Sequence, residues 1–101
     1  EASGLVQRHG LSPSIFIKLM TQTLFACPSY QRYGQNIVSS NFEPGFKLSL
    51  GLKDMNLAID AGRLKGLELP AADAVRLKMT SAVARGDGDK DWSVFAQQTN
   101  H

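Results

Sequence analysis

Two charged residues, Lys53 and Asp54, stand side by side in the middle of the most apolar segment of the chain, residues 46–66. Consecutive helix residues point about 100° apart, so these two side chains do not face each other as a pair. Each therefore needs a polar partner of its own, or must face a cleft. The competing interpretation, which the pattern alone slightly favours, is that Lys53 reaches water and Asp54 makes a structural hydrogen bond.

A second charged stretch, residues 86–91, resembles a calcium-binding loop at first sight. Such a loop requires glycine at its sixth position and a bidentate glutamate at its twelfth. Counted from Asp87, these positions hold Trp92 and Gln98, so the match fails at both. The sequence instead favours a solvated turn that ends in Asp91 as a helix N-cap.

The histidines and the cysteine indicate no further chemistry. His9 and His101 lie at opposite ends of the sequence with no Cys or Asp at ligand spacing, so we expect no metal site. Cys27 precedes a proline and has no evident activating base nearby in sequence, which is typical of a small buried hydrophobe. As the single cysteine, it excludes an internal disulfide and suits a reducing compartment.

Residues 46–66 are expected to form the helix around which the chain is organised. One helical stripe consists of large apolar residues: Leu48, Leu52, Met55 and Ile59. A second set widens it into a broad face: Leu50, Leu57, Ala61 and Leu64. Such a helix should be central to a bundle, with neighbours on several sides. Alternation over residues 46–52 would also fit a strand, but the leucines are unbranched, the stripe continues past Lys53, and no partner strand is evident.

Shorter helices are predicted on both sides of this segment, at residues 1–9, 13–20, 28–38 and 70–85, with a last turn or two after Asp91. Serine and proline mark their starts and glycine their ends. The chain is thus predicted to be all-α, a single domain of about five or six helices. The first helix has no capping residue before it, which indicates that the chain begins inside a longer helix and is a fragment of a larger protein.

Composition narrows the class of protein. The chain has 101 residues, of which 43% are hydrophobic and 20% charged, as in an ordinary soluble globule. A net charge of +2 without a basic cluster argues against nucleic-acid binding. No apolar run is long enough to span a bilayer and no signal peptide opens the chain, so we expect a cytoplasmic protein without membrane partners.

Four sequence blocks resemble the C-terminal domain of β-hydroxyacid dehydrogenases in their order and spacing. They are residues 41–46 (NFEPGF), 50–58 (LGLKDMNLA), 66–70 (GLELP) and 85–93 (RGDGDKDWS). This family includes 3-hydroxyisobutyrate dehydrogenase, tartronate semialdehyde reductase and glyoxylate/succinic semialdehyde reductases. The four blocks lie between residues 41 and 93, and their conjunction is more specific than the Lys–Asp block by itself.

The resemblance implies an all-α domain like the C-terminal domain of 6-phosphogluconate dehydrogenase. In the family it follows a Rossmann domain that binds NAD or NADP, and the connecting helix carries the catalytic lysine. That lysine is expected upstream of Glu1, so no catalytic residue is expected in this fragment. By similarity, Phe46 and Asp54 line the substrate end of the interdomain cleft, while Lys53 faces the nicotinamide cofactor.

The resemblance further implies a parent oxidoreductase that acts on a small β-hydroxyacid or semialdehyde. Family members form dimers or tetramers largely through this domain, so a homo-oligomer is expected, and the fragment alone should be inactive. Two alternatives remain open. One is a helical interaction module without catalysis, and the other is an imine-reductase-like relative.

Overall fold

The computed structural model describes residues 1–97, so His101 lies outside it. Seven helical elements follow one another: α1 (Ala2–Arg8), α2 (Pro13–Gln22), α3 (Pro28–Ser39), α4 (Leu48–Arg63), α5 (Pro70–Ala82), the π-helical η1 (Val83–Asp87) and the 3₁₀-helical η2 (Trp92–Ala96). Within residues 1–97 the β-type pairing is limited to one isolated bridge, between Lys47 and Asp91. The all-α prediction is therefore confirmed. No described helix is long and apolar enough to cross a membrane.

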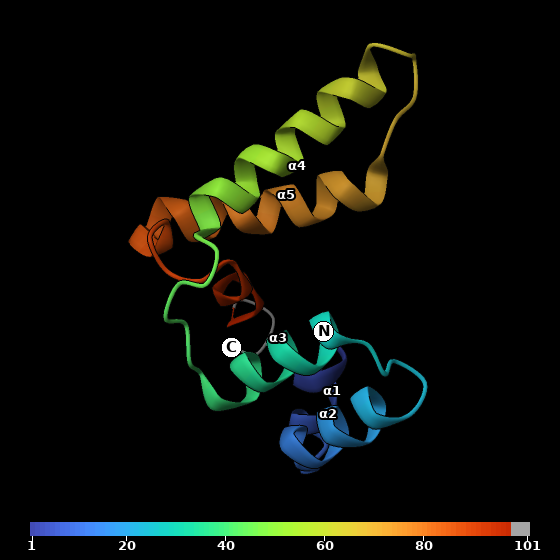
Figure 1. The fold of residues 1–101 in the computed structure, drawn as a ribbon, viewed down its shortest axis with the longest axis vertical. Helices are drawn as coiled ribbons and strands as arrows, with labels where there is room; N and C mark the ends of the chain where they lie inside the picture. The colour runs from blue at the N-terminus through green and yellow to red at the C-terminus, as the bar shows by residue number, and fades with distance from the viewer. Residues whose placement is uncertain (98–101) are drawn as a thin grey trace. The chain divides into compact units, whose positions relative to one another are not determined.

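The chain divides into two compact units. Among the described residues, unit 1 comprises Glu1–Phe42 with residues 96 and 97, and unit 2 comprises Glu43–Phe95. Figure 1 shows the short helices α1, α2 and α3 of unit 1, and the longer α4 and α5 of unit 2, which run alongside each other.

In unit 1, local signals begin the helices where the sequence predicts. The Ser12 hydroxyl accepts the amide of Ile15 at 3.3 Å at the start of α2. The Cys27 sulfur accepts the amide of Tyr30 at 3.5 Å at the start of α3. Each helix then has proline in its first turn. Cys27 is half-buried, so it is a helix cap rather than the fully buried hydrophobe that the sequence favoured.

Glycine lets α2 and α3 approach each other closely. A Cβ added to Gly34 on α3 would lie only 2.7 Å from Cγ2 of Ile17 on α2. Among the described residues of unit 1, the buried ones are all small: Ser3, Gly4, Thr21 and Gly34. The absence of a side chain at Gly34 thus lets side chains of α2 rest directly on the main chain of α3.

Unit 2 contains the buried apolar residues of the described chain: Leu48, Ile59, Met79, Ala82 and Val94. They come from α4, α5 and η2, and the first two belong to the stripe predicted from the sequence. Leu52 and Met55, the other members of that stripe, are half-buried. The stripe is therefore confirmed as the inward face of α4.

The second set of leucines on α4 behaves differently. Leu50, Leu57 and Leu64 are 47%, 59% and 85% exposed. Because α4 packs against α5 and η1, its opposite side stays open within residues 1–97. The prediction that α4 has neighbours on several sides is therefore wrong for the described chain. Apolar spacing identifies residues able to be buried, but not whether this chain supplies the element that buries them.

Candidate functional site

The N-terminus of α4 is closed by main-chain oxygens. The residue before it, Lys47, makes no side-chain cap. The first four amides of the segment, from residue 48 to residue 51, donate to the oxygens of Lys90, Gly88 and Lys47 at 2.9–3.0 Å. Helix N-termini bind anions through such amides when they lack partners. Here all four have acceptors, so this helix end is not an anion site.

Asp91 is the centre of the polar contacts around this helix end. Its Oδ1 accepts the amides of Gly45 and Phe46, each at 3.2 Å. Its Oδ2 accepts the amide of Ser93 at 3.1 Å and the Ser93 hydroxyl at 2.5 Å. Trp92 adds an amide that donates to the Phe46 oxygen at 2.8 Å. The main chain of Phe46 is thus held on both its N–H and C=O sides.

The carboxylate of Asp91 is almost completely enclosed, with 1% of the residue exposed. Burial by itself raises the pKa of a carboxyl, and it is the largest single influence on this group. The hydrogen bonds from Ser93, Phe46 and Gly45 together outweigh it, so the pKa of Asp91 lies below its ordinary value. Asp91 is therefore ionised at neutral pH and acts only as an acceptor.

Asp87 closes the other end of the same loop. Its carboxylate contacts Lys90 Nζ at 2.9 Å and Arg85 Nε at 2.5 Å, and the residue is 7% exposed. The hydrogen bond from Lys90, supported by Arg85, lowers the pKa of Asp87 despite the opposing effect of burial.

The predicted N-cap role of Asp91 is confirmed, because Oδ2 accepts the Ser93 amide at the start of η2. The prediction of a solvated turn is wrong for Asp87 and Asp91, and fits Asp89, whose side chain is 90% exposed. Both buried carboxylates are occupied by donors of the protein itself. Among residues 1–97 no three His, Cys, Asp or Glu residues gather where a metal could bind.

The Phe46 ring lies against α4 at Gly51. A Cβ on Gly51 would be 3.6 Å from Cε1 of Phe46 and 3.4 Å from Cβ of Trp92, so glycine leaves room for both. Asp54 is three residues after Gly51 and shares its side of the helix. Lys53, two residues after Gly51, projects from a different side. Helix periodicity thus puts Asp54 near the side of α4 that the Phe46 ring contacts, and Lys53 on a different side.

Lys53 and Asp54 are both exposed. Neither side chain makes a hydrogen bond or an ion pair within the described part of the chain. The interpretation that Asp54 makes a structural hydrogen bond is therefore not supported, whereas Lys53 does reach solvent. Both charged groups are free to contact a ligand.

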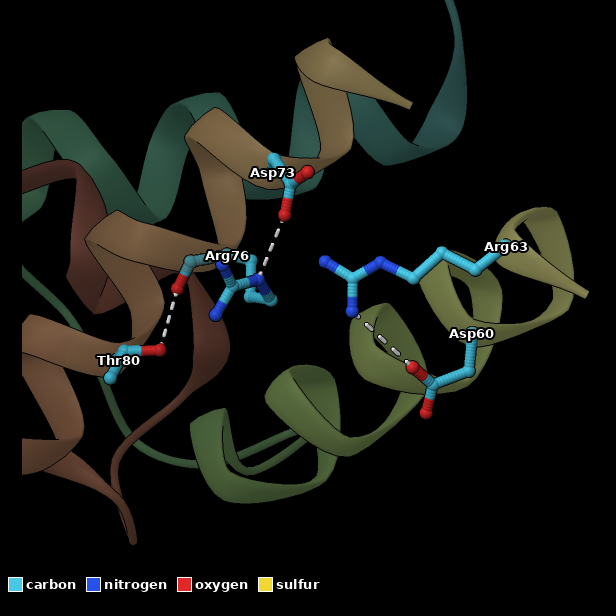
Figure 2. A network of polar contacts seen from close by, with 5 residues as sticks. All are labelled: Asp60, Arg63, Asp73, Arg76 and Thr80. Carbon is cyan, nitrogen blue, oxygen red and sulfur yellow. Dashed lines mark hydrogen bonds and ion pairs between the residues drawn. The ribbon is translucent and has the colours of Figure 1, made fainter. Parts of the chain in front are cut away.

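Some charged residues of unit 2 are paired within their own helices. Figure 2 shows Asp60 with Arg63 on α4, at 3.8 Å, and Asp73 with Arg76 on α5, at 3.1 Å. Such i, i+3 pairs are ordinary surface features of helices. Lys53 and Asp54 form no pair of this kind, but neither does Lys65 among residues 1–97, so the lack of an ion pair alone does not identify a binding group.

Sequence reasoning missed two parts of this arrangement. Asp91 was expected to cap the last turn, but its contacts with Gly45 and Phe46 were not foreseen. Ser93, which supplies two of its hydrogen bonds, was not expected to be buried. The available signal was the Asp-x-Ser spacing in the last of the four blocks, together with the turn at residues 43–45.

The family description "NAD-binding of NADP-dependent 3-hydroxyisobutyrate dehydrogenase" matches residues 1–98. The chain belongs to this family. Its resemblance to β-hydroxyacid dehydrogenases is thereby confirmed.

Individual relatives agree with this placement. The "Uncharacterized oxidoreductase YfjR" of Bacillus subtilis is 39% identical over 92 residues, which are 90% of this chain and 32% of that protein. The 2-hydroxy-3-oxopropionate reductase of Escherichia coli is 31% identical over 65 residues, or 64% of this chain and 22% of that protein. The chain thus spans a third or less of the length of these curated relatives.

A solved structure shows the same fold. The 3-hydroxyisobutyrate dehydrogenase of Salmonella typhimurium superposes with a TM-score of 0.88 at 23% identity. The match covers 97% of this chain and 34% of that chain. At this level of identity the similarity shows the fold alone.

Proposed function

We propose that this chain is the C-terminal domain of a longer NAD- or NADP-dependent oxidoreductase. The parent enzyme interconverts a small β-hydroxyacid and its semialdehyde or keto acid. This domain lines the substrate end of the active-site cleft and contributes to self-association. The observation that carries the proposal is the match of residues 1–98 to the family, and the contact of the Phe46 ring with α4 at Gly51, three residues before Asp54, supports it.

The substrate class is supported by the name of one relative. The Escherichia coli protein reduces 2-hydroxy-3-oxopropionate, a molecule that carries a carboxylate and an aldehyde. A small polar substrate of this kind needs an apolar wall that excludes water and a few placed polar groups. Phe46 supplies the wall. Asp54, an exposed acceptor three residues after Gly51 on α4, binds a hydroxyl of the substrate.

Lys53 fits a contact with the dinucleotide. Its exposed ammonium has no polar partner in residues 1–97, and it can donate to oxygen atoms of a cofactor. When bound, the nicotinamide ring gives or takes a hydride. The proton is handled by a lysine upstream of Glu1, as the family resemblance implies. The choice between NAD and NADP belongs to the Rossmann domain.

Two substitutions in the full-length enzyme test these roles. Lys53→Ala should mainly raise the KM for the dinucleotide, whereas Asp54→Ala should mainly lower kcat/KM for the substrate. A hydrogen bond to a charged group contributes about 1.5–3 kcal/mol, so each defect should be about tenfold or larger. Steady-state rates with glyoxylate, succinic semialdehyde and hydroxyisobutyrate, each with both dinucleotides, provide the measurement.

Lys65→Ala serves as the matched control, because Lys65 is another exposed lysine just beyond the end of α4. It should leave both KM values unchanged. Small and equal effects of Lys53→Ala and Asp54→Ala, with a lower Tm for each, would mean that the two residues serve stability alone. Absence of turnover with every substrate and both dinucleotides would favour a non-catalytic interaction module.

The isolated 101-residue chain should be inactive and should self-associate as a dimer or tetramer. Hydride transfer needs the Rossmann domain and the upstream lysine. Self-association is supported by exposed apolar residues in both units, among them Leu5, Leu57 and Leu64. Sedimentation at micromolar concentration measures it, and a single species at the 11.0 kDa monomer mass would contradict it.

A further inference from the structure

We propose that Asp91 is a positioning residue, which fixes the Phe46 ring over Gly51 and so sets the distance between the apolar wall and Asp54. The inference rests on the proposed function insofar as that wall faces the substrate. It assigns to Asp91 a task beyond capping η2. It also explains why a buried carboxylate stands so close to an exposed candidate site.

Several hydrogen bonds constrain the main chain of Phe46. Phe46 lies outside α4, so no helical hydrogen bond holds its main chain. Its amide instead donates to Asp91 Oδ1 at 3.2 Å, and its oxygen accepts from the Trp92 amide at 2.8 Å. Gly45, the preceding residue, donates to the same Oδ1. Two consecutive amides on one oxygen fix the direction in which the Phe46 side chain leaves the main chain.

The Phe46 ring fits against α4 at Gly51. Three groups surround the open side of Gly51: Cε1 of Phe46, Cβ of Trp92 and Cε of Met79, at 3.6, 3.4 and 3.7 Å from the position of an added Cβ. These are ordinary van der Waals separations, so the ring packs beside residue 51 and still leaves room for a Cβ there. A shift of the residue 45–46 main chain would move the ring away from this part of α4.

Asp91 accepts hydrogen bonds on both carboxylate oxygens, and only the ionised carboxylate can accept all of them. An asparagine of the same shape has a single oxygen, and even when this oxygen faces Gly45 and Phe46 a neutral amide accepts more weakly than a carboxylate. Asp91→Asn therefore keeps the volume of the side chain but weakens the contacts that orient Phe46.

The variant Asp91→Asn should raise the KM of the full-length enzyme for glyoxylate about tenfold, while kcat changes by less than about threefold. If Asp91 acts through Phe46, the effect should vanish in a Phe46→Ala background, because the group being positioned is gone. An equal effect of Asp91→Asn in both backgrounds would overturn the inference. Asp89→Asn, at an exposed carboxylate of the same loop, should leave KM unchanged.

Ser93→Ala separates positioning from general stability. It removes the hydroxyl that donates to Oδ2 and keeps the two amide contacts on Oδ1. We expect it to lower Tm much as Asp91→Asn does, with less than a twofold change in KM. If KM instead follows Tm across both variants, Asp91 has only a structural role.

Amide hydrogen exchange decides the inference independently of activity. In Asp91→Asn, the amides of Gly45 and Phe46 should exchange about tenfold faster or more, while those of α5 keep their rates. A uniform acceleration through α4 and α5 would overturn the inference. Should the wild-type enzyme turn over none of the three substrates, the proposed function fails and the exchange rates alone decide whether Asp91 holds this segment.

Discussion

The two units of the chain bury different kinds of residue. Unit 2 encloses Leu48, Ile59, Met79, Ala82 and Val94. Unit 1 encloses only small residues, and its large apolar side chains are exposed or half-buried. An apolar groove of unit 1 is lined by such side chains, among them Phe16, Met20 and Phe25. A helical pattern of apolar residues thus yields a closed core in one unit and an open surface in the other.

The difference in buried residues indicates which unit is more stable. In unit 2 the buried apolar residues accompany two buried carboxylates, Asp87 and Asp91, both of which accept hydrogen bonds from the protein. In unit 1 the helices α2 and α3 meet at Gly34 and Thr21, and fewer large apolar side chains are removed from water than in unit 2. We therefore expect unit 2 to be the more stable one. The chain offers separate probes: its one tryptophan, Trp92, lies in unit 2, and both tyrosines, Tyr30 and Tyr33, lie in unit 1.

The largest effect is expected from the core of unit 2. Leu48→Ala removes a completely buried side chain and should lower the free energy of unfolding by about 2–5 kcal/mol. Urea unfolding followed by Trp92 fluorescence measures the loss. Leu64→Ala, at a leucine 85% exposed, is the control and should change it by less than about 0.5 kcal/mol. Similar losses for both variants would show that the open face of α4 is covered in solution.

A smaller loss is expected from the helix contact of unit 1. Gly34→Ala places a Cβ 2.7 Å from Cγ2 of Ile17, so the two helices must move apart. Overpacking of this kind costs about 1–3 kcal/mol, of which the better helix propensity of alanine offsets about 1. The tyrosine signal of urea unfolding should report it.

Gly51→Ala is the matched control, because its added Cβ meets its nearest neighbour at 3.4 Å. It should be neutral or slightly stabilising in the tryptophan signal. Destabilisation by Gly51→Ala larger than that by Gly34→Ala would contradict the spacing seen in both units.

Acid should affect unit 2 before unit 1. The pKa values of Asp87 and Asp91 are lowered in the folded chain, so on acidification the unfolded chain takes up protons first. Their stabilisation is complete above the ordinary aspartate pKa of about 4 and is lost as pH falls through the lower folded values. Within residues 1–42 of unit 1 the only acidic residue is Glu1.

An acid titration followed at both probes measures this difference. The tryptophan signal should change at a higher pH than the tyrosine signal, and Asp91→Asn should make the tryptophan transition shallower. Coincident transitions that are unaffected by Asp91→Asn would show that other groups control the acid response.

The smallest effect is expected at the surface of unit 2. Asp89 contacts Lys47 Nζ at 3.2 Å, but their side chains are 90% and 50% exposed. Asp89→Ala should therefore change the free energy of unfolding by no more than about 0.5 kcal/mol, less so at high salt. A loss above about 1 kcal/mol would mean that the loop of residues 86–91 depends on this exposed pair as well as on its buried carboxylates.

Much of the fold could be predicted because its signals are local. Ser12 with Pro13, Pro28 and Pro70 begin helices through signals within one turn. Gly86, with a φ of 100°, interrupts η1, which follows α5 directly. The openness of Leu57 and Leu64 could not be predicted, because burial depends on elements that periodicity does not describe.

The candidate site could be predicted only in part. The pattern drew attention to Lys53 and Asp54, and their roles together with that of Phe46 came from the family resemblance. The hold of Asp91 on Phe46 joins segments far apart in the sequence, and no local pattern describes such a contact. For the same reason the acidic loop of residues 86–91 was expected to be solvated, although two of its carboxylates are enclosed.

The contact between Asp91 and the residue 45–46 main chain also bears on how long unit 2 stays folded. The hydrogen bonds that Asp91 accepts from Gly45 and Phe46 span 46 and 45 positions of the sequence. They therefore form only after α4 and α5 have folded the chain back on itself. Contacts made late in folding are weak in the transition state, and their removal mainly speeds unfolding. We therefore expect Asp91 to have little influence on the folding rate of unit 2 and a large influence on its unfolding rate.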